Sequence, residues 1–195
     1  MHNRFFVCIV ILFAACNSNK KASVPDSLTT TPKIIIGDTV SNFFPVTSFL
    51  KGEIYSIKTG GITPIKRTTI GIKMDSVFLK ESDFETSFAE FLSPVIDTSN
   101  LKNSFTEKRF LDQTLNAFTF TYDPTNGVST GFAFTHWDVY VDPETNKVRR
   151  IYLTKNIGAE TNLLMTWQSG KWCEVVTIKK DAILKKEKIS WSYEE

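Results

Sequence analysis

His136 and Asp138 are the residues of this chain whose types and spacing best fit acid/base chemistry. Residues two apart on a strand point to the same side, so their side chains would lie together and could exchange protons. Nucleophilic catalysis would also need a serine or cysteine beside the histidine. We favour a strand histidine whose ring nitrogens are satisfied by hydrogen bonds. The predicted class is non-catalytic, and a hydrolytic role of this pair is the only enzyme hypothesis.

Cys173 and the 142–146 segment offer little further chemistry. Cys173 lies on an alternating apolar segment, which favours a small buried residue over a reactive thiol. Oxygen-bearing side chains stand at every second position of this segment, as at the start of a calcium-binding loop: Asp142, Glu144 and Asn146. The glycine and the distal glutamate of such a loop are missing. His136 is the only histidine after His2, so a zinc site built from cysteines and histidines is excluded. We predict no metal and no cofactor, and no phosphate-binding or dinucleotide fingerprint occurs.

Five aromatic residues are candidates for ligand binding. Together they could line a concave sheet and hold an apolar or sugar-like ligand. Packing beneath helices accounts for the same residues without a ligand, and we favour that interpretation, because aromatic neighbours on adjacent strands stabilise a sheet by themselves. The five residues are Trp137, Tyr140, Tyr152, Trp167 and Trp172.

The N-terminus carries its own chemistry. Arg4 precedes an uncharged apolar run over residues 5–15, which is too short to cross a bilayer and is typical of a secretory signal peptide. Phe13-Ala14-Ala15-Cys16 resembles a bacterial lipobox, with Phe13 in place of the usual aliphatic residue. In a lipobox the thiol accepts a diacylglycerol and the chain is cut just before it, here between Ala15 and Cys16. We therefore predict lipidation at Cys16, and two or three acyl chains would anchor the protein stably in a membrane.

Residues 16–43 are predicted to be a flexible tether between the lipid and the domain. The stretch 20–33 is rich in Ser, Thr, Pro and Lys and has too few apolar residues to offset the entropy of ordering. Asn17 stands where an aspartate would resemble an inner-membrane retention signal. We therefore expect a cell-envelope location, at the outer membrane facing the periplasm, with residues 1–15 as signal peptide and 44–195 as a single domain.

Composition excludes several function classes. The formal net charge is +2 and no basic stripe occurs, so nucleic acid is not an expected partner. With Cys8 in the signal segment and Cys16 lipidated, Cys173 has no thiol left to pair with, and the domain must be held by its core. The chain has 16 Phe, and together with many β-branched residues these favour a sheet.

Periodicity predicts an α+β fold. Residues 45–58 have a helical apolar stripe interrupted by Glu53, and residues 82–93 have a phenylalanine stripe behind a capping box formed by Ser82 and Glu85. A hairpin is expected over 64–79. From residue 104 the period changes to two, which is typical of antiparallel strands. We expect two N-terminal helices packed on an antiparallel meander of about five to seven strands.

Four short segments carry a resemblance to a known group. They are residues 75–79 (DSVFL), 91–94 (FLSP), 118–122 (FTFTY) and 138–143 (DVYVDP). Their order resembles an uncharacterised lipoprotein group of Bacteroidota, over about half the chain. The resemblance implies a location and no activity, so no functional residue is carried over from it.

Two non-catalytic functions remain open from the sequence. The first is a lipid-anchored binding or accessory module. It would be attached to the membrane by its lipid and would bind an unknown envelope protein through the open sheet face or an edge. The second is a carrier or sensor of a hydrophobic ligand, which requires an apolar cavity between sheet and helices. A filled interior would count against the carrier.

Overall fold

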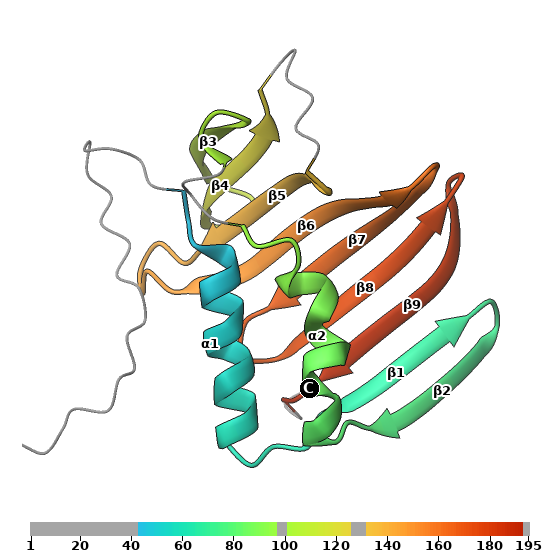
Figure 1. Ribbon diagram of the computed structural model, residues 1–195. Helices are drawn as coiled ribbons and strands as arrows, with labels where there is room; N and C mark the ends of the chain where they lie inside the picture. The colour runs from blue at the N-terminus through green and yellow to red at the C-terminus, as the bar shows by residue number, and fades with distance from the viewer. Residues whose placement is uncertain (1–42, 97–100, 126–131, 193–195) are drawn as a thin grey trace, which may run out of the picture. The chain divides into compact units, whose positions relative to one another are not determined.

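The structure is a computed structural model that describes residues 43–96, 101–125 and 132–192 (Figure 1). All of these belong to one structural unit, Lys33–Glu195. The predicted signal peptide, the lipidation site Cys16 and the tether up to residue 42 lie outside the described residues.

One antiparallel sheet forms the frame of the domain. Within the described residues it has nine strands, in the order β2-β1-β9-β8-β7-β6-β5-β4-β3. Two α-helices and one short 3₁₀-helix, Glu81–Asp83, accompany it. The bounds are α1 Val46–Thr59, β1 Ile65–Ile70, β2 Lys73–Phe78, α2 Phe84–Leu92, β3 Phe105–Asp112, β4 Ala117–Pro124, β5 Phe134–Val141, β6 Val148–Gly158, β7 Thr161–Gln168, β8 Trp172–Lys179 and β9 Ala182–Ser190.

The predicted α+β class is confirmed, but the predicted count of five to seven strands is wrong. The hairpin β1–β2, which the chain forms between the two helices, belongs to the same sheet because β1 pairs with β9, with Ile65 opposite Ser190. Two strands of the sheet therefore precede α2, and the helices do not both stand at the N-terminal end. A pairing between segments so far apart in the sequence leaves no mark in local periodicity.

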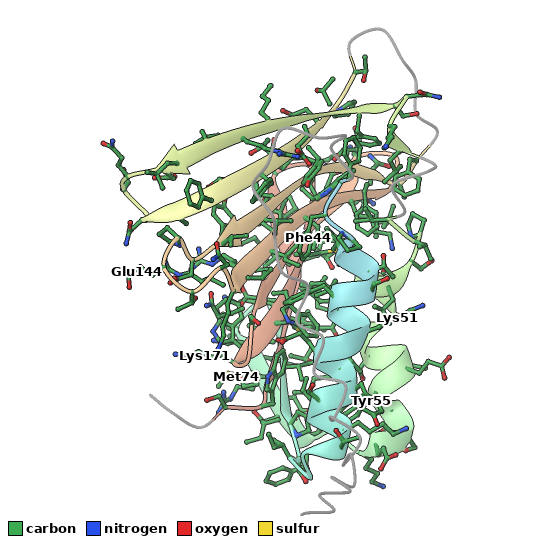
Figure 2. All side chains as sticks on the ribbon, turned by 90° about the vertical axis from the view of Figure 1, so that its left-hand side faces the viewer. Phe44, Lys51, Tyr55, Met74, Glu144 and Lys171 are labelled. Carbon is green, nitrogen blue, oxygen red and sulfur yellow. The ribbon has the colours of Figure 1, made fainter. Side chains whose placement is uncertain are left out.

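Both helices lie on the same side of the sheet, as Figure 2 shows nearly edge-on. Helix α2 buries Phe84, Phe88 and Phe91, the phenylalanine stripe that the sequence predicts. The predicted capping box is wrong, because a 3₁₀ turn occupies 81–83 and makes Asp83 the N-cap, with no side-chain cap. The hydroxyl of Ser82 donates instead to the Asp83 carboxylate at 2.9 Å.

Aromatic rings fill the space between the helices and the sheet. The ring centroids of Phe88 and Phe91 lie 5.6 and 5.3 Å from that of Trp167 on β7. Trp191 adds a ring 5.0 Å from Trp167. Such contacts are within the range of favourable aromatic pairs, and each ring removes a large apolar area from water. These side chains occupy the volume that a hydrophobic ligand between sheet and helices would need.

Two polar side chains fasten the helices to the sheet. Glu53 interrupts the apolar stripe of α1 because its carboxylate accepts hydrogen bonds from the Ser169 hydroxyl and the Gly170 N–H, both at 2.9 Å, in the β7–β8 turn. Lys155 on β6 is 8% exposed and donates to the Glu90 carboxylate and the Ser93 carbonyl, both at 2.6 Å. The ammonium of Lys155 lies at the C-terminal end of α2, where a positive charge is also stabilised by the negative end of the helix dipole.

The part of the chain that the structure describes holds no helix with the length and apolar character needed to cross a membrane.

Candidate functional site

The candidate site is the side of the sheet opposite the helices, which we call the open face. Along β5, Trp137 and Val139 point toward the helices, so His136, Asp138 and Tyr140 point the other way. The strand register carries this alternation across the sheet, from Asp138 to Tyr152 on β6 and on to Thr166 and Glu174. Antiparallel sheets commonly cover one face and leave the other to solvent.

The five predicted ligand-binding aromatics divide between the two faces. Trp137 and Trp167 are fully buried on the helix side of the sheet, with 0% of each residue exposed. Tyr140, Tyr152 and Trp172 are half-buried on the open face. The five therefore do not form one wall. The division follows from the strand register, which decides how the two-residue alternation of one strand continues on the next.

His136 and Asp138 do share a face, as their spacing predicts. They belong to a chain of hydrogen bonds on the open face. The Nδ1 and Asp123 Oδ1 atoms are 2.8 Å apart, and Nε2 and Asp138 Oδ2 are 3.0 Å apart. Asp138 also accepts from the Thr121 hydroxyl at 2.6 Å and from the Tyr140 hydroxyl at 3.2 Å.

This network favours the charged form of the imidazole. Burial opposes the imidazolium, but hydrogen bonds and charge from Asp123 and Asp138 outweigh it, so the pKa of His136 is raised above its usual 6.5. The hydrogen bond from His136 in turn lowers the pKa of Asp123, whose other oxygen pairs with Lys108 at 3.1 Å. Both ring nitrogens are occupied by carboxylates. The preferred interpretation, a histidine with satisfied hydrogen bonds, is confirmed.

The other residues examined for chemistry have structural roles. Cys173 is buried, as predicted, and burial raises the pKa of its thiol well above the usual range. Asp142 accepts hydrogen bonds from the N–H groups of Glu144 and Thr145 at 3.0 and 2.8 Å, so the 142–146 segment is a turn stabilised by its own aspartate. The described residues contain no group of three or more His, Cys, Asp or Glu that could hold a metal ion.

The β8 and β9 strands add charged groups to the open face that the sequence patterns did not point to. The ammonium of Lys188 lies 4.5 Å from the ring centroid of Trp172, within cation–π range. Glu174 on β8 pairs with Lys186 on β9 at 2.9 Å. The alternation within each strand shows which side chains of β8 share a side and which of β9 do. Only the register between β8 and β9 shows that these charged and aromatic side chains meet on the open face.

Comparisons with family models, with curated proteins and with solved structures give no match to this chain.

Proposed function

We propose that this protein is a non-catalytic binding or accessory module of the cell envelope, anchored by lipid at Cys16, which binds an envelope protein through the open face. The observation that supports this most is that three half-buried aromatic residues, Tyr140, Tyr152 and Trp172, lie on the open face among threonines and paired charges. Tyrosine, tryptophan and arginine are the residues most enriched at the energetic centres of protein interfaces.

The hollow beside Tyr140 and Gln168 is too small for a whole small molecule. Its volume is about 60 Å³, whereas small-molecule sites typically enclose about 300–1,000 Å³. We do not propose the carrier of a hydrophobic ligand, because Phe88, Phe91 and Trp167 fill the space between helices and sheet.

The anchor and the resemblance to Bacteroidota lipoproteins rest on the sequence. The anchor depends on Cys16 as the acceptor of the lipid, and Asn17 in place of a retention aspartate favours the outer membrane facing the periplasm. Cells expressing the chain should incorporate radiolabelled palmitate into it. Cys16→Ser should abolish the label and release the protein from the membrane fraction, whereas unchanged labelling and fractionation would remove the anchor from the proposal.

The binding face is tested by alanine substitution combined with chemical crosslinking in cells. On the open face, Tyr152→Ala and Trp172→Ala should each lower the yield of the crosslinked adduct with the envelope partner, because central aromatic residues contribute about 2 kcal/mol or more to an interface. Tyr55→Ala is the matched control, since Tyr55 is 66% exposed on α1 and lies on the helix side (Figure 2). An adduct lost with Tyr55→Ala and kept with both open-face variants would overturn the proposal.

A further inference from the structure

A β-bulge brings two successive arginines to one hollow at an end of the open face. Tyr140 pairs with Arg150 while Val141 pairs with Val148, so Arg149 is an extra residue in β6. Such an extra residue interrupts the alternation and redirects a side chain. Arg149 and Arg150 consequently both line the hollow of about 60 Å³, together with Leu115, Ala117, Tyr140 and Gln168.

Neither guanidinium has a carboxylate partner among the described residues. Arg149 donates from Nη1 to the carbonyls of Leu115 and Asn116, at 3.3 and 2.9 Å. Arg150 donates from Nε to the side-chain oxygen of Gln168 at 3.1 Å. Each guanidinium has five N–H donors, so both keep several for another acceptor.

The nearby carboxylates that the structure describes form no ion pair with either arginine. Asp112 accepts from the backbone N–H groups of Thr114 and Leu115 at 2.9 and 3.0 Å. Asp142 caps its own turn. The hydrogen bonds of that turn lower the pKa of Asp142 most, and the charge of Arg149 adds to this only from a distance. The hydroxyl of Tyr140 donates to Asp138. The free polar groups of the hollow are thus donors, namely the two guanidinium groups and the amide nitrogen of Gln168.

The chemistry and the size of the hollow select the same kind of group. Two neighbouring positive charges repel each other until an anion lies between them, and guanidinium groups bind oxyanions through paired N–H donors. A water needs about 10–15 Å³ of such space, so a volume of about 60 Å³ accommodates roughly four to six oxygen-sized atoms. A tetrahedral oxyanion has four oxygens.

We propose that Arg149, Arg150 and Gln168 form a binding site for one phosphate-type oxyanion, either a free anion or the phosphate of a lipid headgroup. The site goes beyond the proposed function, because it requires neither the lipid anchor nor an envelope protein. Its failure would leave the proposed binding of a protein by the rest of the open face untouched.

The test is calorimetric titration of the full chain carrying Cys16→Ser with inorganic phosphate at constant ionic strength. Each of Arg149→Gln and Arg150→Gln should weaken phosphate binding about 10-fold or more, since a hydrogen bond to a charged group is worth about 1.5–3 kcal/mol. Arg67→Gln is the matched control. It removes the same charge from an exposed position of β1, away from the hollow, and should leave the affinity within about twofold of the parent chain.

A second arm separates the two sources of phosphate. Sedimentation of the same chain with phosphatidylglycerol vesicles, competed by inorganic phosphate and weakened by Arg150→Gln, would assign the site to a lipid headgroup. Binding of inorganic phosphate without vesicle binding would assign it to a free anion. Absence of both, or equal loss with Arg67→Gln, would overturn the proposal. Because Arg149 also holds the β3–β4 turn, Arg150→Gln keeps the test valid should Arg149→Gln unfold.

Discussion

Lys155 offers the sharpest test of how the helices are held on the sheet. We predict that Lys155→Met, which keeps most of the side-chain volume and removes the ammonium, destabilises the domain. The lost bond to the Ser93 carbonyl is worth about 1.5–3 kcal/mol, because it is charge-assisted and buried. The pair with Glu90 adds only about 0–1 kcal/mol, because the Glu90 side chain is 52% exposed and can be solvated by water.

The expected total is a loss of about 1.5–4 kcal/mol in the free energy of unfolding. For a domain of this size, each kcal/mol lowers Tm by about 2–4 °C, so Tm should fall by roughly 3–16 °C. Urea unfolding followed by circular dichroism measures the change. The slope with urea should not change, since the surface exposed on unfolding is nearly the same.

Two control variants make the Lys155 result decisive. Glu90→Gln should cost at most about 1 kcal/mol, because the Ser93 carbonyl keeps its donor. Lys51→Met, at an exposed position of α1, should change stability by less than about 0.5 kcal/mol. If Lys155→Met lowers the free energy of unfolding no more than Lys51→Met does, Lys155 does not stabilise the packing of α2 on the sheet.

Three further outcomes are expected. Glu53→Ala should destabilise by about 1–3 kcal/mol in urea, as the Ser169 hydroxyl and the Gly170 N–H lose their acceptor; an unchanged midpoint would contradict this. His136 has a raised pKa, so its stabilisation is complete below about pH 6.5 and is lost as the pH rises through the folded-state value. In His136→Gln, the free energy of unfolding should no longer fall over this pH range. The same pH profile in the variant and the parent chain would show that His136 does not cause the fall. Cys173 should react with a thiol reagent only after unfolding, and fast labelling of the native chain would show an accessible thiol.

The helices and the strands themselves were predictable because their signals are local. The phenylalanine spacing of α2 and the alternation around Phe118–Tyr122 each require only neighbouring residues. The pairing of β1 with β9 was not predictable, since it joins distant segments and depends on the packed sheet. Glu53 was visible as an exception to an apolar stripe, but its partners lie in a turn far along the chain.

The candidate site was predictable only in part, for the same reason. The spacing of His136 and Asp138 places them on one face, but Asp123, which occupies the other ring nitrogen, comes from a neighbouring strand. The separation of Trp137 from Tyr140 follows from alternation within β5. That Tyr140 and Trp172 lie on the same face of the sheet follows only from the register of the four strands β5 to β8. The bulge at Arg149 has no local signal, because an extra residue is defined only against the partner strand.

The most direct test of the open face as the binding surface is site-specific photocrosslinking in intact cells. A photoreactive amino acid at Thr166, in the middle of β7 on the open face, should give a discrete adduct with an envelope protein. The same amino acid at Lys51, on the helix side (Figure 2), should give none. Adducts at Lys51 and their absence at Thr166 would contradict the assignment and place the binding surface on the helices.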